Sequence, residues 1–273
     1  MYLPCTHFVF TERRFTLKII TDEQIRALGI PLPSFYGWVV DSLKHKASSV
    51  LPPKTSLHSP GDIFFNTMPC ILPYKNVEGV KMVNRYPGRR PSIMGNIVLH
   101  NIATGELKAI MDAEYITSMR TGAVAAHSIK LLARQDYRTI GMIGLGATAN
   151  ATLDMLLAIE PGRVFTVKLY RYKDHAQRFM EKYCSNKQLQ FIICDDYDST
   201  IKGSDVIISC VTVATQNFCA DDKYDPGAWS FPSIPEVSKI AICFLTRCSV
   251  MTPPMSAILN ISTDFAHSRK YPK

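Results

Sequence analysis

The stretch YRTIGMIGLGATANATLDMLLAIE, residues 137–160, decides the fold. An apolar run at 137–144 is followed by two closely spaced glycines and then by a helical pattern of apolar residues. This order of strand, glycine turn and helix is typical of the unit that binds the pyrophosphate of a dinucleotide. The turn fits the pattern G-x-G-x-x-A with Gly144, Leu145, Gly146, Ala147, Thr148 and Ala149.

The small residues of this turn each have a physical role. Gly144 permits a tight turn, Gly146 lets the pyrophosphate approach backbone N–H groups, and Ala149 allows the helix to pack closely on the strand. The N-terminus of the helix adds partial positive charge. We therefore interpret the six residues as a cofactor-binding turn, and the alternative is a purely structural glycine turn.

The residues around this unit continue an alternation of strands and helices. Apolar strands are expected at 164–170, 189–195 and 204–212, and a helix is expected at 173–184. Alternation of this kind predicts a parallel sheet with crossover helices, so the fold class is α/β and the domain is of the Rossmann type.

Residues 17–133 have a different texture, typical of an α+β domain. A strand runs into a short helix within 17–30, where Thr21 and Gln24 match a capping box. Two longer helices, several strands and a hairpin follow. The helices are expected at 34–51 and 113–133, the strands at 61–66, 69–73 and 79–84, and the hairpin at 96–102 and 107–112.

The end of the second strand of the α/β region bears on the choice of cofactor. An acidic residue there accepts a hydrogen bond from the ribose 2′-hydroxyl of NAD, whereas a cation accommodates the 2′-phosphate of NADP. The strand ends in Tyr170, Arg171, Tyr172 and Lys173, and no acid comes before Asp174. This favours NADP over NAD, with Arg171 as a cofactor residue. NAD, or a turn with solvated charges only, is the alternative.

Composition excludes several classes of protein. The 273 residues are 47% hydrophobic and 20% charged, which is typical of globular proteins. No apolar run approaches the ~18 residues of a membrane span. The net charge of +8 is spread along the chain without a basic, aromatic stripe, so nucleic acid is not an expected partner. The eight cysteines form no CxxC pair, which predicts no metal site and favours reduced thiols in the cytoplasm.

Two cations upstream are candidates for binding an anion. Arg120 lies in the middle of a helix, among Ala123, Ala125 and Ala126. Close packing there predicts an anionic partner for the arginine, either a substrate carboxylate or a cofactor phosphate, and an exposed helix charge is the alternative. Lys81 lies in a β-type stretch and by itself indicates little.

Together these pieces resemble the ornithine cyclodeaminase/mu-crystallin family. The resemblance is carried by LPPKTS (51–56), KMVNRYP (81–87), the run ATGELKAIMDAEYITSMRTGAVAAHSIKLLA (103–133) and the GLGATA turn that follows it. It spans about residues 17–227. It implies a homodimer, a substrate-binding and dimerisation domain at 17–133, and a Rossmann domain at 134–227.

The resemblance also implies roles for individual residues. Lys81 matches the catalytic lysine near the substrate carboxylate and the reacting carbon, and Arg120 matches the carboxylate-binding arginine. Thr121 is expected beside the cofactor together with Arg120. Lys54 stands where many members carry an arginine, so it keeps the charge but loses the bidentate geometry. The last strand of the region places Cys210 and Thr212 on the nicotinamide side.

The activity that the resemblance implies is hydride transfer at the α-carbon of a small amino acid. In ornithine cyclodeaminase, NAD⁺ takes this hydride, the side-chain amine attacks the resulting imine, ammonia leaves and the hydride returns. The chain is therefore expected to be an NAD(P)-dependent enzyme that cyclises ornithine or catalyses a related reaction. The alternatives are an NADP-dependent ketimine reductase or amino-acid dehydrogenase, and a non-catalytic NADP-binding protein like mu-crystallin.

The sequence departs from the family after residue 227. Residues 228–273 contain only two acidic residues, Glu236 and Asp264, and have no counterpart of the family's catalytic aspartate. Read one nucleotide earlier, suitable codons for this tail give a sequence that resembles the missing family segment. We therefore expect a frameshift near Gly227, an incomplete Rossmann domain with an unpaired sheet edge, and little turnover. A native divergent tail is the alternative. Residues 1–16 are expected to be an unstructured leader.

Overall fold

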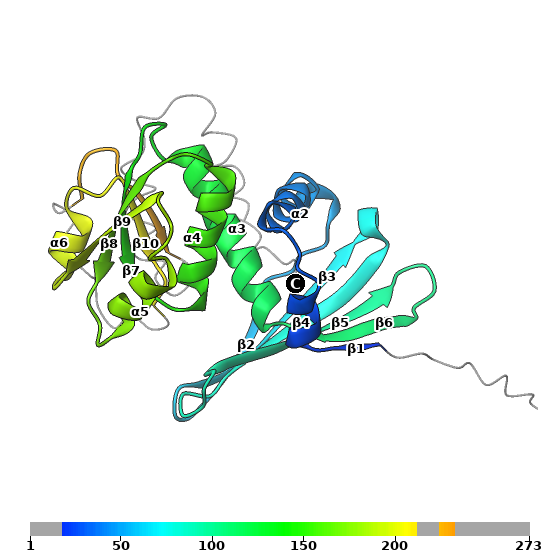
Figure 1. The fold of residues 1–273 in the computed structure, drawn as a ribbon. Coiled ribbons are helices and arrows are strands. Elements are labelled where there is room, and N and C mark those ends of the chain that lie inside the picture. The colour runs from blue at the N-terminus through cyan, green and yellow to red at the C-terminus, as the bar shows by residue number, and fades with distance from the viewer. Residues whose placement is uncertain (1–17, 212–223, 233–273) are drawn as a thin grey trace, which may run out of the picture. The chain divides into compact units, whose positions relative to one another are not determined.

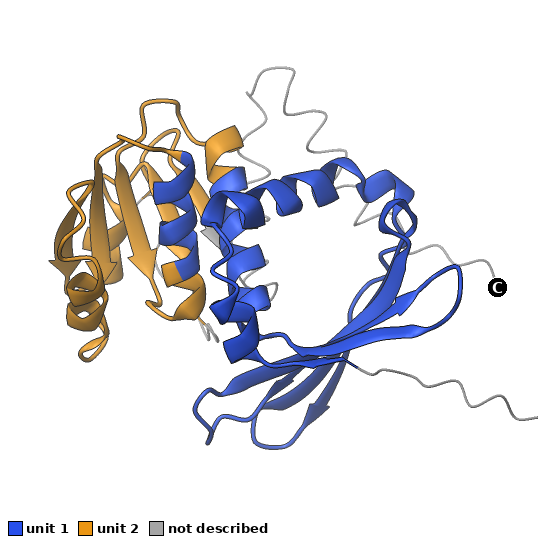
Figure 2. Cartoon of the chain, turned by 45° about the vertical axis from the view of Figure 1, so that its right-hand side comes forward, with its two compact units in different colours: residues 1–127, 151–159 blue, residues 128–150, 160–273 orange. Residues whose placement is uncertain are grey.

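The computed structural model describes residues 18–211 and 224–232, which divide into two compact units (Figures 1 and 2). Unit 1 contains the described residues within 1–127 and 151–159, and unit 2 contains those within 128–150 and 160–273. The expected leader 1–16, Thr212 and residues 233–273 of the tail lie outside the described residues.

Unit 1 is built on a six-stranded sheet in the order β1-β6-β5-β4-β3-β2. The short β1 pairs in parallel with β6, and all other neighbours are antiparallel. The expected hairpin is confirmed as β5 and β6. The strands are β1 (Ile19–Ile20), β2 (Thr55–Ser59), β3 (Ile63–Leu72), β4 (Val77–Arg85), β5 (Ile93–Asn101) and β6 (Leu107–Asp112).

The expected strands at 61–66 and 69–73 are one continuous strand, β3, although it contains Pro69. A proline is tolerated in a strand where no ladder hydrogen bond is required of its nitrogen. Ile71, two residues on, directs its N–H to Val50 on the β2 side of the sheet, so the nitrogen of Pro69 faces the same side. The pairing of β2 with β3 ends at Thr55 and Thr67, before Pro69 is reached.

The helices of unit 1 follow the sequence signals closely at their starts. Thr21 caps α1 (Asp22–Ala27) in a capping box: its hydroxyl accepts from the N–H of Gln24 (3.3 Å), and its own N–H donates to Oε1 of Gln24 (2.9 Å). The helix expected at 113–133 is α3 (Glu114–Leu132).

The second helix is shorter than expected. The predicted span 34–51 is replaced by α2 (Leu32–Lys44) and a 3₁₀ turn, η1 (Lys46–Ser48). The hydroxyls of Ser48 and Ser49 both donate to the carbonyl of His45 (2.9 Å each), and such local bonds compete with helix continuation. A second 3₁₀ turn, η2 (Pro73–Lys75), links β3 to β4.

Unit 2 contains a parallel five-stranded sheet in the order β11-β10-β7-β8-β9, which confirms the α/β, Rossmann-type prediction (Figure 1). Its strands are β7 (Thr139–Ile143), β8 (Phe165–Tyr170), β9 (Leu189–Cys194), β10 (Val206–Ser209) and β11 (Trp229–Pro232). The helices are α4 (Ala147–Ile159), α5 (His175–Lys182) and α6 (Tyr197–Ile201). Residues 151–159 of α4 are grouped with unit 1.

Buried apolar side chains explain why β7 and β10 are central strands. Every residue of β10 and four of the five in β7 are buried, as expected for strands covered on both faces. Ile143 and Ile207 from these strands pack with Ile201 of α6 and with Ala228, which precedes β11.

The first residues after the departure at residue 227 add one strand to the sheet. Residues 229–232 pair with β10 along its whole length, from Trp229 opposite Val206 to Pro232 opposite Ser209, and β11 is then the edge strand of the described sheet. The short apolar segment is sufficient because an edge strand requires hydrogen bonding on one side only.

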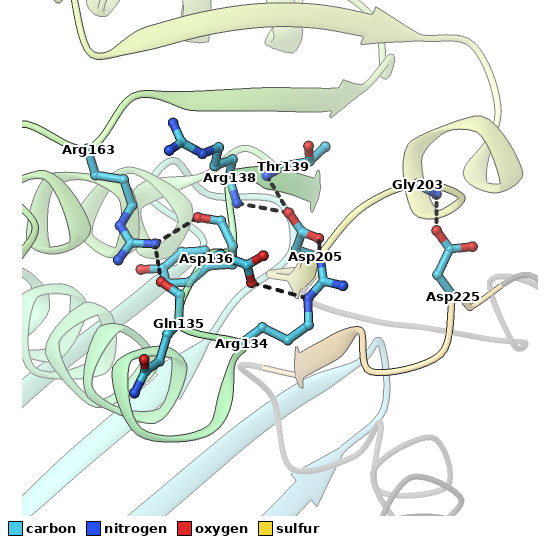
Figure 3. A network of polar contacts seen from close by, with 10 residues as sticks. Arg134, Gln135, Asp136, Arg138, Thr139, Arg163, Gly203, Asp205 and Asp225 are labelled. Atoms are coloured by element: carbon cyan, nitrogen blue, oxygen red, sulfur yellow. Dashed lines mark hydrogen bonds and ion pairs between the residues drawn. The ribbon is translucent and has the colours of Figure 1, made fainter.

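Asp205 fixes the opposite end of the parallel sheet from the glycine turn (Figure 3). Its carboxylate accepts from the backbone N–H groups of Arg138 (2.8 Å) and Thr139 (2.9 Å) at the start of β7, and it forms an ion pair with Arg134. Burial raises the pKa of Asp205, but the two backbone hydrogen bonds and the charge of Arg134 outweigh this effect and lower it. The ionised carboxylate therefore ties the start of β10 to that of β7.

In the part of the chain that the structure describes, no helix is both long and apolar enough to cross a bilayer. Within the same residues, no group of histidine, cysteine and acidic side chains could hold a metal ion. The four described cysteines, Cys70, Cys184, Cys194 and Cys210, form no disulfide bond.

Candidate active site

The glycine turn after β7 has the backbone geometry that a nucleotide-binding turn requires. Gly144 has φ +84°, and a Cβ on it would lie 2.7 Å from the carbonyl carbon of Cys210 and from the nitrogen of Val211. The N–H of Cys210 donates to the carbonyl of Ile143 (2.7 Å) and holds the two segments together. No residue other than glycine fits at position 144.

Gly146 has the opposite environment. It is exposed, and an added Cβ would find nothing within 4 Å. Open space beside a glycine that directly precedes helix α4 is where the pyrophosphate of a dinucleotide approaches backbone N–H groups. Ala147 is exposed and Ala149 is fully buried, as expected for a turn that faces ligand on one side and packs on the other. The residues present therefore fit a dinucleotide.

The other expected cofactor residues lie at the same edge of the parallel sheet or on α3. Leu145, Thr148 and Cys210 are half-buried. Arg171 directly follows β8 and forms an ion pair with Asp195, whereas Thr212 lies outside the described residues. The hydroxyl of Thr121 on α3 donates to the carbonyl of Thr117 (2.7 Å).

Helix α3 is fixed by unusually close contact with α4. A Cβ on Gly122 would lie 2.5 Å from the carbonyl carbon of Ala151 and 2.7 Å from the nitrogen of Thr152. Helix α2 holds α3 from another direction, because the Tyr36 hydroxyl is 2.9 Å from Nδ1 of His127. The helix that carries Arg120 and Thr121 is therefore fixed by backbone contact with Ala151 and Thr152 of α4.

Lys81 and Arg120 are brought together. Lys81 and Val83 lie on one face of β4, and Gly95, the partner of Val83, approaches Ala113 just before α3, so this face looks toward the start of α3. The pKa of Lys81 is lowered to about 8. Burial is the main cause, and the positive charge of Arg120 is the smaller one. Neither side chain forms an ion pair or hydrogen bond with another described residue.

Arg120 has no anionic partner among the described residues, and its side chain has solvent access. The expectation that a substrate carboxylate or a cofactor phosphate pairs with its guanidinium stays a prediction. The surrounding protein nevertheless desolvates the guanidinium and lowers its pKa. The small residues near it serve another purpose, since Ala123, Ala125 and Ala126 are completely buried and Gly122 meets α4.

Lys54 is level with Lys81 across the sheet, two strands away. It is exposed and directly precedes β2, where Thr55 pairs with Thr67. Extending this register by one residue sets Lys54 level with Met68, whose partner on β4 is Lys81. Two strand spacings, roughly 10 Å, separate the backbones of the two lysines, which is within reach of a ligand held by both long side chains.

Asp195 is the residue that the sequence analysis missed. Its carboxylate lies 2.5 Å from Nε of Arg171. The available signal was its place directly after the apolar strand LQFIIC, because the carboxyl ends of parallel strands meet at one edge of the sheet.

Several curated proteins are similar to this chain in sequence. The chain is 32% identical over 179 residues to alanine dehydrogenase from Archaeoglobus fulgidus, covering 62% of this chain and 52% of that protein. It is 28% identical over 169 residues to mouse ketimine reductase mu-crystallin, covering 60% of this chain and 52% of that protein. The chain thus spans about half the length of these curated relatives.

Solved structures agree in fold. An archaeal alanine dehydrogenase dimer with bound NAD superposes with a TM-score of 0.70 at 26% identity, covering 78% of this chain and 66% of that one. The Δ(1)-pyrroline-2-carboxylate reductase of Thermococcus litoralis, solved with NADH and L-proline, gives a TM-score of 0.71 at 23% identity and covers 79% and 68%, a likeness of fold alone. The model of the ornithine cyclodeaminase/mu-crystallin family matches residues 34–229. The chain therefore belongs to the ornithine cyclodeaminase/mu-crystallin family.

Proposed function

We propose that this chain binds NAD(P) at the glycine turn and the carboxylate of a small amino or imino acid at Lys81 and Arg120, and that it acts as an enzyme at the α-carbon. The single observation that carries the proposal is the pair of neighbouring cations without counter-ions among the described residues. Two partly desolvated positive charges repel each other, and an anionic ligand removes that cost.

The two cations have different tasks in this proposal. The planar guanidinium of Arg120 can hold both oxygens of a carboxylate. Lys81, with a pKa of about 8, is partly deprotonated near neutral pH and can exchange a proton beside the reacting carbon, which makes it the proposed catalytic residue. Lys54 is proposed to assist with its charge from the neighbouring register position.

The dinucleotide is proposed to lie on the turn Gly144–Ala149, with Thr121, Cys210 and Thr212 on its nicotinamide side. When bound, it would supply hydride transfer to or from the substrate carbon. The open space at Gly146 and the exposed start of α4 support this placement.

The reaction type is proposed from the relatives' names, which are alanine dehydrogenase and ketimine reductase. The proposed carboxylate site and the proposed dinucleotide site would serve a reductase or dehydrogenase of a small amino or imino acid. They would equally serve a redox-neutral cyclodeaminase. A binding protein without turnover is the second candidate. Residues 228–273 contain only two acids, Glu236 and Asp264, and neither is a counterpart of the family's catalytic aspartate.

Isotope transfer tests the enzyme proposal. Protein is incubated with NAD⁺ and a panel of α-deuterated amino acids, including alanine, ornithine and proline, and deuterium on the nicotinamide is measured by mass spectrometry. We expect transfer by the wild type. Arg120→Ala should reduce transfer at least a hundredfold, because a lost charged hydrogen bond to the substrate costs about 2–3 kcal/mol or more.

Lys130→Ala is the matched control, since Lys130 is an exposed cation on the same helix. It should leave isotope transfer unchanged. Dinucleotide binding without transfer to or from any substrate would replace the enzyme proposal by the binding-protein candidate. Full transfer by Arg120→Ala would contradict the carboxylate role.

We also propose that the chain forms a homodimer in the cytoplasm. The face of the six-stranded sheet opposite Lys81 exposes Ile19 (67%), Leu57 (61%) and Phe65 (37%), an apolar surface that a second copy could cover. The archaeal alanine dehydrogenase of similar fold is a dimer. The absence of a disulfide bond among the described cysteines supports a reducing compartment.

A further inference from the structure

Arg171 and Asp195 form an ion pair at the carboxyl edge of the parallel sheet. Arg171 is the first residue after β8, and its N–H donates to the carbonyl of Cys194 (2.8 Å), the last residue of β9. Its Nε lies 2.5 Å from Oδ1 of Asp195, the next residue of the chain after β9. The pair therefore joins the ends of two neighbouring strands.

The ion pair lies where the adenosine ribose of a dinucleotide is expected. Strand β8 lies directly beside β7, which carries the glycine turn. In sheets of this topology, the residues just after the second strand meet the adenosine ribose, and their charge decides whether a 2′-hydroxyl or a 2′-phosphate is accepted. Arg171 occupies that position.

The other charged residues of this loop are engaged elsewhere. Asp174, the first acid after β8 in the sequence, pairs with Arg178 one helical turn along α5 (2.9 Å). Lys173 directs its ammonium over the ring of Tyr172, 5.4 Å from the ring centre. Asp195 is therefore the acid that contacts the cation expected to meet the ribose.

We propose that Asp195 is the specificity-determining residue for the cofactor and that it selects NAD over NADP. The inference rests on the proposed function. Asp195 neutralises Arg171 and holds a negative charge where the 2′-phosphate would add another, and like charges placed together in a binding site are strongly disfavoured. The sequence analysis favoured NADP because Arg171 is a cation at this position, whereas the ion pair with Asp195 favours NAD.

Calorimetric titration with NADH and NADPH tests the inference on the whole chain. We expect the wild type to bind NADH about tenfold or more tightly than NADPH. Asp195→Asn should lower this ratio by about tenfold or more, mainly through tighter NADPH binding, because it frees the guanidinium of Arg171. Adding Arg171→Gln to Asp195→Asn should remove the gain.

Asp174→Asn is the matched control, since it neutralises a neighbouring acid that pairs with another arginine, and it should leave the ratio unchanged. Both acids are more than half exposed, with 76% of Asp195 and 66% of Asp174 accessible, so the variants are expected to fold. An unchanged ratio in Asp195→Asn, or a wild type that prefers NADPH, overturns the inference and leaves the proposed function standing. Binding of neither dinucleotide by the wild type overturns both.

Discussion

At the residue scale, Lys81 places a positive charge where burial and the charge of Arg120 both disfavour it. Its ammonium is desolvated on the face of β4 that looks toward the start of α3, and Arg120 repels it there. A buried charge without a counter-ion is retained in a folded protein at the expense of folding free energy.

Lys81→Met should therefore stabilise the protein at neutral pH, by about 1–3 kcal/mol in urea unfolding. The pKa of Lys81 is about 8 in the folded state against 10.5 for a free lysine. The unfolded chain binds the extra proton between these values, so the wild type gains stability as pH rises from about 8 to 10.5. The variant should lose that gain.

Lys108→Met is the control, because Lys108 is an exposed lysine on β6 of the same sheet. It should change neither the stability at pH 7 nor its dependence on pH. A destabilised Lys81→Met variant would mean that the ammonium has an anionic partner in the protein.

At the element scale, α3 is in close backbone contact with α4 at Gly122. Gly122→Ala should destabilise the chain by about 1–3 kcal/mol, because its Cβ would lie 2.5–2.7 Å from the backbone of Ala151 and Thr152 and the two helices must separate. Thermal unfolding followed by circular dichroism measures this. Gly37→Ala on α2, where a Cβ meets nothing within 4 Å, should instead be neutral or stabilising by up to about 1 kcal/mol. Equal effects of the two substitutions would contradict the close contact.

Local signals predicted most elements of both units. The capping box at Thr21, the hairpin of β5 and β6, and the alternation from β7 to β10 are all encoded by neighbouring residues and appear as expected. The departures from prediction have non-local causes. Pro69 is accepted inside β3 because β2 ends before reaching it, and β11 forms because β10 offers a free edge. Neither partner is visible from the segment itself.

The candidate site divides in the same way. The glycine turn is a continuous motif and was predicted residue by residue. By contrast, the neighbouring cations Lys81 and Arg120 come from distant segments, and so do the two partners of the ion pair between Arg171 and Asp195. Family resemblance supplied the first pair. The second follows only from the parallel pairing of β8 with β9, which places the ends of these strands together.

At the scale of the whole molecule, we predict that the protein is a homodimer in solution. Light scattering coupled to size exclusion should give twice the mass of the 30.6 kDa chain. Phe65→Glu should shift the protein to the monomer, since it puts a charge on the exposed apolar sheet face. Ile192→Glu, at a residue of unit 2 that is 46% exposed, should leave the dimer intact. A monomeric wild type would contradict the proposal.

Binding of a dinucleotide at the glycine turn is tested by titration of a Gly146→Val variant with NADH. Position 146 has room for a side chain and an ordinary backbone conformation, so the variant should fold with unchanged circular dichroism. Its side chain would fill the space proposed for the pyrophosphate, and binding should weaken at least a hundredfold. Gly88→Val, at a similarly open glycine, should bind like the wild type. Undiminished NADH binding by Gly146→Val would mean that the glycine turn does not hold the dinucleotide.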